Sequence, residues 1–347
     1  MPGSAPASDA DQLLARRAAV LALLRQTGDG RLSGQEIAQQ LGISRTAVSN
    51  HIAALRREGY RIDSATRVGY HLSQSPDLPL PWEVCPLLTG GFRQVTGGAE
   101  TGSTNDDALD LARKGAPEGT VVLAARQTKG RGRLGRTWKS PEGGLYASYV
   151  LRPQAPLERV SALSLVVALA VADALERFGV PGVRLKWPND LLLFDDEGAE
   201  MGKVAGILLE MSAQMDGVEY VIPGIGLNVN RPVDVPVIDD GGRRQAAYVS
   251  DRIDAVPRLA ELAAAQIDCL AARYQAWKSA GCSFAPFRDE YVERLSTLGQ
   301  DVRVVAMGGE VLASGIVIGI DDLGRLLVRD EDGTIAPVTA GEVSLRG

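Results

Sequence analysis

Histidine and cysteine are scarce in this chain, which has two histidines and three cysteines among 347 residues. They are scattered along the sequence, without the spacing of a metal site or of a disulfide framework, at His51, His71, Cys85, Cys269 and Cys282. Cysteines that are few and odd in number suit a reducing compartment. We therefore expect neither zinc nor thiol chemistry, and a cytoplasmic location.

Long hydrophobic runs are also missing. The chain is 45% hydrophobic, but no uninterrupted stretch approaches the roughly 20 residues that span a bilayer. Residues 1–12 are small and polar, without the basic and then apolar layout of a secretory signal. We expect a disordered start at residues 1–12, no membrane partner and, from the length, two or three domains.

Acidic residues are few in one part of the chain. Residues 15–72 carry nine arginines against four carboxylates, a net charge of +5, although the whole chain carries −6. The remainder must then be strongly acidic. A basic module on an acidic body indicates a nucleic acid partner for the N-terminal part alone.

Helix-boundary signals in this basic segment predict three helices. The signals are the first apolar position Leu13, the stop Gly28, the capping-box pair Ser33 and Glu36, the cap Ser44 and the stop Gly59. Two short alternating segments, 60–63 and 69–72, then predict a hairpin. Together these elements predict a winged helix-turn-helix over residues 13–74, whose third helix would enter the major groove of DNA.

The outward face of that third helix is polar. It carries Arg45, Thr46, Ser49, Asn50 and Arg56, which offer donors and acceptors for bases and phosphates. A small helical docking module with a solvated face is the alternative. We favour DNA binding, because an ordinary solvated face would include acidic residues.

The rest of the chain has an α+β pattern. A proline-rich segment, 75–85, predicts a stiff linker. Residues 86–293 alternate strand patterns with longer helices, the second over 157–178, which predicts a mixed sheet with helices packed on it. Within this part, 231–245 has the composition of a mobile insertion. Short strands and turns over 294–347 predict a small SH3-like barrel.

A loop rich in glycine and arginine is the most informative feature. Residues 130–136 read GRGRLGR and follow an apolar segment that predicts a strand. The glycines allow the backbone to approach a ligand closely, and arginine forks suit carboxylate or phosphate. Dinucleotide and P-loop motifs both require a helix next, whereas Pro141 and two glycines follow here. We therefore predict an anion clamp that orders around its ligand.

Three further motifs accompany the loop: ETGSTN at 100–105, KWPND at 186–190 and GKVAGILLE at 202–210. Together with the loop, they resemble the motifs of biotin protein ligases. With the N-terminal module included, residues 14–347 resemble the bifunctional biotin ligases and biotin-operon repressors of bacteria. The resemblance implies that the central part is the ligase domain.

The activity that the resemblance implies has two steps. The carboxylate of biotin attacks the α-phosphate of ATP, giving biotinyl-5′-AMP and pyrophosphate, and a lysine of the biotin carboxyl carrier protein of acetyl-CoA carboxylase then attacks the adenylate. Both steps need negative charge neutralised and reactants aligned. ATP and Mg²⁺ are the implied cofactors, and biotin is both substrate and corepressor precursor. The resemblance also implies a homodimer that forms when adenylate is bound and that binds operator DNA.

The resemblance implies specific site residues. Biotin contacts are expected at Ser103, Thr104, Asn105, Gln127, Arg131, Gly132, Arg133 and Lys203. ATP or adenylate contacts are expected at Arg131, Arg136, Trp138, Lys186, Asn189 and Asn228. Arg133 and Lys203 are expected to be catalytic. The residue types agree, because Ser103 can cap the following helix and Gln127 can both donate to and accept from a ureido ring.

Structural roles compete with functional ones at three positions. Lys203 opens an apolar strand, where a buried ammonium needs a partner, so either a ligand anion satisfies it or its head reaches water. Asp190 either serves as the Mg²⁺ ligand or caps a turn. Trp187 either walls a ligand or packs in the core.

Other functions also fit parts of this pattern. A lipoate ligase or an octanoyltransferase has a related domain, although the transferase needs a cysteine among the catalytic strands, and the three cysteines lie outside them. A biotin-sensing transcription factor with a degenerate ligase fold is a second alternative. A ligase whose N-terminal domain regulates nothing is a third.

Overall fold

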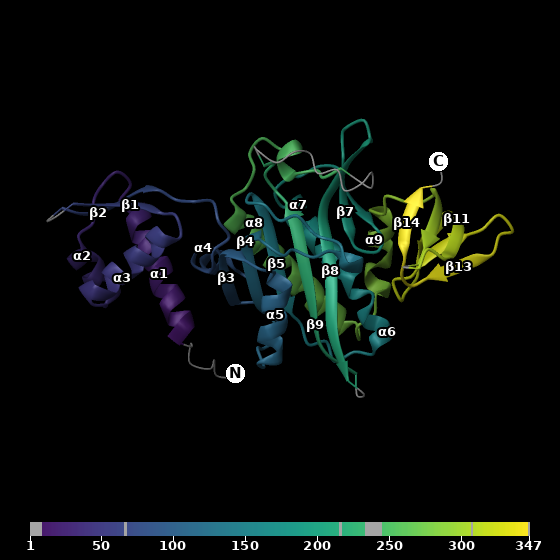
Figure 1. The fold of residues 1–347 in the computed structure, drawn as a ribbon, viewed down its shortest axis with the longest axis horizontal. Helices are drawn as coiled ribbons and strands as arrows, with labels where there is room; N and C mark the ends of the chain where they lie inside the picture. The colour runs from purple at the N-terminus through teal and green to yellow at the C-terminus, as the bar shows by residue number, and fades with distance from the viewer. Residues whose placement is uncertain (1–8, 66–67, 215–216, 233–244, 307, 346–347) are drawn as a thin grey trace.

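The computed structural model describes residues 9–65, 68–214, 217–232, 245–306 and 308–345. Three bodies follow one another along the long axis (Figure 1): a helical N-terminal domain, a central sheet with helices on both faces, and a C-terminal β domain. This α+β architecture confirms the predicted fold class. None of the helices in the described ranges combines the length and the apolar character needed to cross a bilayer.

The N-terminal domain is the predicted winged helix-turn-helix. Its elements are α1 (Asp9–Gln26), α2 (Gly34–Leu41), α3 (Arg45–Arg57), β1 (Arg61–Ala65) and β2 (Gly69–Gln74). The Ser33 hydroxyl accepts from the Glu36 amide (3.1 Å) and the Glu36 carboxylate accepts from the Ser33 amide (2.7 Å), so the predicted capping box is confirmed. The helices enclose a core of its own around Leu21, Ile37 and Ile52.

The start of α1 differs from the prediction. Disorder was expected through residue 12, but residues 9–12 are already helical, and residues 1–8 lie outside the described part of the chain. A helical backbone does not have to end where its apolar stripe ends, which is why the first hydrophobic residue misplaced the boundary.

The linker is more structured than its proline content suggested. Residues 81–84 form a short helix, α4 (Pro81–Val84), followed by the turn η1 (Cys85–Leu87). Leu80 and Trp82 are buried in the N-terminal core, whereas Val84 is buried in the core of the central domain. The end of the predicted linker is therefore a packed joint between two domains.

The central domain is built on a seven-stranded mixed sheet in the order β3-β4-β5-β9-β8-β7-β6. The strands are β3 (Gln94–Thr101), β4 (Thr120–Gln127), β5 (Gly144–Val150), β6 (Val183–Lys186), β7 (Asp190–Phe194), β8 (Glu200–Gln214) and β9 (Gly217–Asn228). Only the β3–β4 pair is parallel among these pairings. The edge strand β3 was not predicted.

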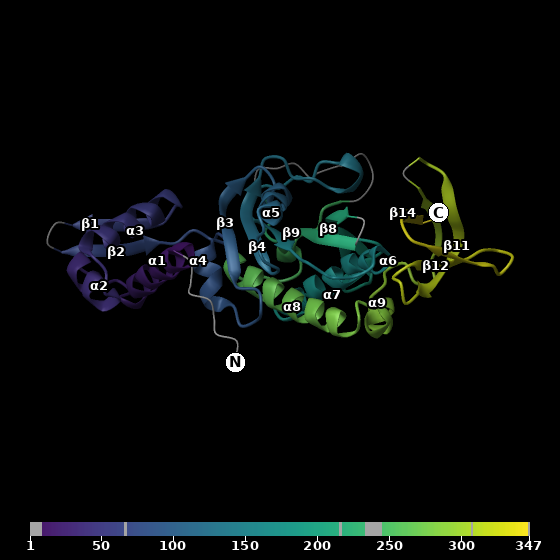
Figure 2. The same cartoon turned by 90° about the horizontal axis from the view of Figure 1, so that it is seen from below.

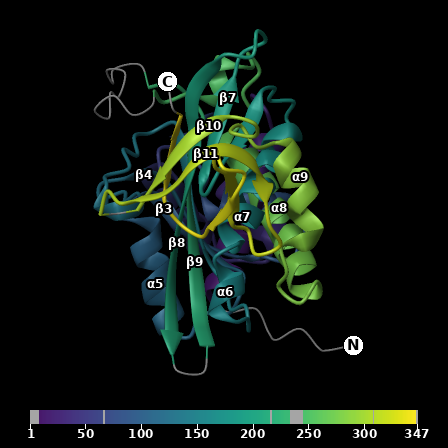
Figure 3. The same cartoon turned by 90° about the vertical axis from the view of Figure 1, so that its right-hand side faces the viewer.

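Helices cover both faces of this sheet. Figures 2 and 3 show α5 (Thr104–Arg113) on one face, with α7 (Leu163–Glu176) and α8 (Leu259–Ser279) on the other. Strand β4 serves both layers, because Val122 packs with α5 while Val121 and Leu123 belong to the larger core. A strand that is buried on both faces has an almost continuously apolar sequence.

The remaining helices adjust two predictions. The helix expected over 157–178 is interrupted, and consists of α6 (Leu157–Val160) and α7. Short helices that had not been predicted include η3 (Val249–Asp251), η4 (Ala285–Phe287) and α9 (Arg288–Glu293). Most of the predicted mobile insertion, residues 233–244, lies outside the described residues.

The C-terminal domain is a five-stranded antiparallel sheet in the order β13-β12-β11-β10-β14. Its strands are β10 (Asp301–Val305), β11 (Val311–Ile320), β12 (Leu326–Arg329), β13 (Ile335–Val338) and β14 (Glu342–Leu345). Small β-rich character is confirmed, whereas closure into an SH3-like barrel stays a prediction. Val302, Val317 and Leu326 join the core of the central domain, so the two pack as neighbours.

Candidate active site

Two cavities adjoin on the central domain and share a wall. The first is lined by the floor residues Ser103, Thr104, Asn105 and Gln127, by Arg131, and by residues 206–208 and 224–226. The second runs between the central and C-terminal domains and is lined by Arg136, Lys186, Asp190 and residues 341–345, among others. They enclose about 460 and 1540 Å³ of space, part of it open to solvent. Both are lined by Gly132, Arg133, Trp138, Asn189 and Lys203.

The loop at 130–136 crosses the boundary between the cavities. It contains a single tight turn, η2 (Arg133–Gly135), with positive φ at Leu134 (62°), and extended backbone follows instead of an α-helix. The loop is closed on itself, because the Gly132 amide donates to the Arg136 carbonyl (2.8 Å) and the Trp138 amide donates to the Gly130 carbonyl (3.0 Å). This geometry agrees with the exclusion of dinucleotide and P-loop folds.

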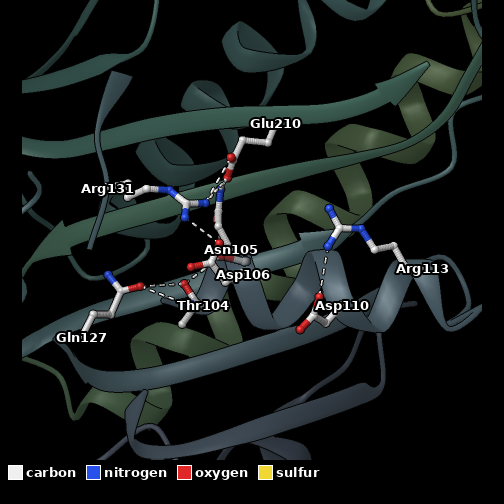
Figure 4. A network of polar contacts seen from close by, with 9 residues as sticks. Thr104, Asn105, Asp106, Asp110, Arg113, Gln127, Arg131 and Glu210 are labelled. Atoms are coloured by element: carbon white, nitrogen blue, oxygen red, sulfur yellow. Dashed lines mark hydrogen bonds and ion pairs between the residues drawn. The ribbon is translucent and has the colours of Figure 1, made fainter. Parts of the chain in front are cut away.

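The floor of the first cavity is a hydrogen-bonded layer. Gln127 Oε1 accepts from the amide (2.9 Å) and from the hydroxyl (3.1 Å) of Thr104, and Gln127 Nε2 donates to Ser140 Oγ (2.8 Å). Ser148 Oγ donates to Asn105 Oδ1 (2.6 Å). Figure 4 shows Thr104 and Asn105 at the start of α5, with Gln127 of the neighbouring strand β4 reaching Thr104. The floor is therefore prearranged for a small polar ligand.

The predicted cap of α5 is wrong in its detail. Ser103 occupies the N-cap position but its side chain makes no capping hydrogen bond. The carboxamide of Gln127, from the neighbouring strand β4, accepts from the Thr104 amide instead. Ser103 is 3% exposed and lines the first cavity.

Lys203 has a protein partner that the sequence did not predict. Its Nζ lies 2.7 Å from Asp190 Oδ1 on the neighbouring strand and 4.9 Å from the centre of the Trp138 ring. The indole lies directly against β9, since a Cβ at Gly226 would fall 2.4 Å from Trp138 Nε1. The Lys203 side chain therefore lies between a carboxylate and an aromatic face, and it borders both cavities.

Arg133 is the second cation shared by the two cavities. Its Nη1 donates to Asn189 Oδ1 at 2.9 Å, which joins the loop to the turn between β6 and β7. Burial lowers the pKa of the Arg133 guanidinium, while Asp190 opposes that shift. A guanidinium stays protonated at neutral pH even so, and Arg133 therefore brings a positive charge to the wall that the two cavities share.

Of the other residues predicted to contact the nucleotide, two line the second cavity and one lines neither cavity. Arg136 and Lys186 line the second cavity, and Arg136 forms an ion pair with Glu342 of the C-terminal domain. Asn228 is not among the described residues that line either cavity, and its Nδ2 donates to the Lys203 carbonyl (3.1 Å). Trp187 packs in the core, 2% exposed, with its Nε1 donating to the Gly324 carbonyl (2.9 Å), and it also lines the second cavity, so the structure leaves both roles predicted for it open.

Two carboxylates among the described residues line the second cavity, and both are paired with cations. Asp190 is paired with Lys203, and Glu342 is paired with Arg136. In the described part of the chain, no three acidic, cysteine or histidine side chains gather as a metal site. Mg²⁺ often binds through one or two carboxylates together with substrate phosphates, so Asp190 fits this role only alongside a bound nucleotide.

The predicted DNA-binding residues divide into two groups. Arg45, Thr46, Ser49 and Asn50 are exposed on one side of α3 and are available to a partner. Arg56 is exposed as well, but its Nε donates to the Ile62 carbonyl (2.9 Å) in β1. Arg56 therefore supports the wing, in addition to any contact with DNA.

Sequence reasoning missed several residues at the site. Ser140, Ser148 and Glu342 were not singled out, and neither were Asp106 and Glu210, which both pair with Arg131. Glu210 ends the motif at 202–210, and that placement was the one available signal. The others come together only through the order of strands in the sheet.

This geometry defines a class of protein: a two-cavity domain with a cationic loop between the cavities, joined to a winged helix. Comparisons with known families agree with it. Models of the Biotin/lipoate A/B protein ligase family, an HTH domain and the Biotin protein ligase C terminal domain match residues 97–228, 16–71 and 297–346.

Similar proteins extend the match over nearly the whole chain. The bifunctional ligase/repressor BirA of Bacillus subtilis is 34% identical over 94% of this chain and 97% of its own length. A biotin--[acetyl-CoA-carboxylase] ligase of Paracoccus denitrificans is 38% identical over 72% of this chain and 99% of its own. The biotin protein ligase of Aquifex aeolicus, solved in complex with biotin and ATP, aligns with a TM-score of 0.60 at 32% identity, covering 74% of this chain and 99% of that one. The chain therefore belongs to the family of bifunctional biotin protein ligases and repressors.

Proposed function

We propose that this chain is an ATP-dependent biotin protein ligase that forms biotinyl-5′-AMP and transfers the biotinyl group to a lysine of the biotin carboxyl carrier protein. The observation that carries the proposal is the shared wall of the two cavities. Biotin in the first cavity and ATP in the second would bring carboxylate and α-phosphate together beside Arg133 and Lys203, which line both. Two cations there favour the charge that develops during the attack.

The floor residues then have defined tasks. Ser103, Thr104, Asn105 and Gln127 hold the ureido ring of biotin, while Arg131 and Gly132 close over it. Arg136, Trp138, Lys186 and Asn189 bind the nucleotide, and Asp190 is placed to share Mg²⁺ with the phosphates. Mg²⁺ would neutralise phosphate charge when bound. Asn228 acts indirectly, through its hydrogen bond to the backbone carbonyl of Lys203.

Labelling of a purified biotin carboxyl carrier domain tests the proposal. With ATP and biotin, the carrier mass should increase by one biotinyl group, and a carrier whose acceptor lysine is replaced by arginine should remain unmodified. Labelling with lipoate and none with biotin would contradict the assignment. Binding of biotin without pyrophosphate release would instead indicate a sensor that has lost catalysis.

The second proposed activity is biotin-responsive repression. An exposed face with few carboxylates on α3 supports binding to operator DNA, and a specific operator normally needs two half-sites, hence a homodimer. Adenylate that orders the active-site loops before dimerisation would lower the entropy lost on assembly. Anisotropy titrations on the promoter of the organism's own biotin genes should show tighter binding with biotin and ATP. No binding with both at saturation would leave a ligase whose N-terminal domain is not regulatory.

We also propose domain boundaries near 13–74, 86–293 and 294–347, and a cytoplasmic location. The three cysteines, all within the described residues, form no disulfide, which suits a reducing compartment. A fragment that starts at Val84 should melt cooperatively and retain ligation. Starting at residue 76 would leave Leu80 and Trp82 without their core, so that longer fragment should be less soluble.

A further inference from the structure

Glu210 on β8 contacts both the loop and the floor of the first cavity. Its two carboxylate oxygens accept from Arg131 Nη2 at 3.1 and 3.0 Å, and its Oε2 also accepts from Asn105 Nδ2 at 2.6 Å. Figure 4 shows this carboxylate reaching both side chains. Arg131 belongs to the clamp and Asn105 to the floor, so one acidic side chain connects the two halves of the cavity.

Asn105 is buried, and both ends of its side-chain amide are hydrogen-bonded. It is 5% exposed, and its Oδ1 accepts from Ser148 Oγ, which is fully buried. A Cβ at Gly224 would fall 1.9 Å from Asn105 Oδ1, so the amide lies directly on the β9 backbone. With Oδ1 used by Ser148, the Nδ2 group is oriented by Glu210, which determines how the floor presents the amide.

Arg131 has a second acidic partner. Asp106 on α5 accepts from Arg131 Nη1 at 2.6 Å. The side chain of Glu210 is 30% exposed and that of Asp106 is 47% exposed, so Glu210 is the better shielded of the two. Only Glu210 of this pair is also bonded to the floor among the described contacts.

We propose that Glu210 is a positioning residue that fastens the loop at 130–136 to the floor of the biotin cavity, through Arg131 on one side and Asn105 on the other. This inference rests on the proposed function for the identity of the ligand. By stabilising the ordered arrangement of the loop, Glu210 lowers the free energy needed to order it when biotin binds. We call the contacts of Glu210 with Arg131 and Asn105 the clasp. Glu210 is not among the described residues that line either cavity, so it does not touch the reacting groups, and the clasp should affect the binding of biotin more than the chemical step.

The full-length chain carrying Glu210→Gln provides the test. Loss of the charged hydrogen bonds should raise the Kd and KM for biotin about tenfold, with kcat within about threefold of the parent. Trypsin, which cleaves after arginine, should cut the ligand-free loop faster. Asp106→Asn should have a smaller effect. Asp110→Asn is the matched control, because Asp110 lies on the same helix and pairs with Arg113 on an exposed surface (Figure 4).

Two further variants keep the inference falsifiable. If Glu210→Gln melts early, Glu210→Asp keeps the charge with a shorter reach and should give an intermediate KM. The double variant of Arg131→Ala with Glu210→Gln should bind biotin scarcely more weakly than Arg131→Ala alone, since both remove one connection. The clasp would be refuted if the two substitutions weakened biotin binding by factors that multiply in the double variant. It would also be refuted if Glu210→Gln left both the KM for biotin and the rate of loop cleavage unchanged. Loop cleavage is read without ligand, so a parent chain that fails to bind biotin would refute the proposed function and still leave the clasp testable.

Discussion

Arg25 in the first helix of the winged helix and Glu83 in α4 form a two-pronged ion pair at the junction of the N-terminal and central domains. Arg25 Nη1 lies 2.8 Å from Glu83 Oε2, and Nη2 lies 2.7 Å from Oε1. The hydroxyl of Tyr60 donates to the same carboxylate (2.5 Å), and Arg258, at the start of α8, approaches it to 3.4 Å. Glu83 therefore contacts both domains while its side chain is 3% exposed.

Glu83→Ala should destabilise the chain. The carboxylate is buried but Arg25 is 35% exposed, so solvent partly compensates the guanidinium that is left behind, while the Tyr60 hydroxyl loses its acceptor. We expect a loss of about 1–3 kcal/mol in the free energy of unfolding. Urea denaturation followed by circular dichroism measures this loss. Glu100→Gln removes an exposed pair with Arg126 and serves as the control, with an expected loss below about 1 kcal/mol. If Glu83→Ala and Glu100→Gln lowered the free energy of unfolding equally, the contacts of Glu83 between the two domains would not be stabilising.

Stability should depend on pH through the same carboxylate. Burial would raise the pKa of Glu83, but the hydrogen bonds from Arg25 and Tyr60 outweigh it and lower the pKa below its ordinary value. The contribution of Glu83 is then complete above the ordinary glutamate pKa of about 4.3, and is lost as the pH falls through the lower folded value. The stability difference between the parent and Glu83→Gln should be constant above about pH 5 and shrink in acid. A difference unchanged down to pH 3 would refute this cause.

Lys203→Ala should slow formation of the adenylate. The ammonium borders both cavities, and its loss removes positive charge where the α-phosphate reacts and leaves Asp190 without its counter-ion. We expect the single-turnover rate to fall on the order of a hundredfold. Rapid-quench measurement of biotinyl-AMP determines that rate. An unchanged rate would exclude Lys203 from the chemical step.

Arg133→Gly should loosen the clamp instead. Arg133 joins the loop to Asn189, and without this connection the adenylate should escape faster, by about tenfold. Retention of labelled biotinyl-AMP during gel filtration compares the two proteins. If the half-life of the complex equals that of the parent, Arg133 does not retain the adenylate.

The face of α3 should be separable from ligation. Arg45→Ala and Asn50→Ala should each weaken operator binding about tenfold, with carrier labelling unchanged, since both residues lie on α3 of the N-terminal domain. Arg56→Ala should also lower the melting temperature, because it removes the support of the Ile62 carbonyl. Anisotropy titration and thermal melts together distinguish the roles. Wild-type DNA affinity in Arg45→Ala and Asn50→Ala would move the contact surface elsewhere.

Local signals were sufficient for the N-terminal domain. The capping box of Ser33 and Glu36 and the left-handed turn at Gly42 lie within a few positions of the helix ends that they determine. By contrast, β3 was missed because its sequence, QVTGGAET, contains two glycines and little hydrophobic alternation. Its parallel pairing with β4 supplies the hydrogen bonds that make it a strand, and such a pairing has no local signature.

The candidate site was predictable where motifs carried it. Arg133, Lys203 and the floor residues, which the resemblance implied to be biotin contacts, line the same cavity, and their binding of biotin stays a prediction. The partners of those residues were not predictable, since Asp190, Ser148 and Glu210 reach them from other strands of the sheet. The contact of Asn228 was not predictable either. The resemblance named it as a nucleotide contact, but its side chain donates to the backbone of Lys203 on the neighbouring strand.

The second cavity lies between two domains, and this placement affects folding as well as catalysis. Its walls include Lys186 on one side and Glu342 on the other, and the bond from Trp187 to Gly324 holds the two sides together. Under the proposed function, a nucleotide in this cavity would touch both walls, and by mass action it would stabilise the docked arrangement of the two domains. ATP would then also favour docking of the C-terminal domain, whose attachment should strengthen as the nucleotide concentration rises.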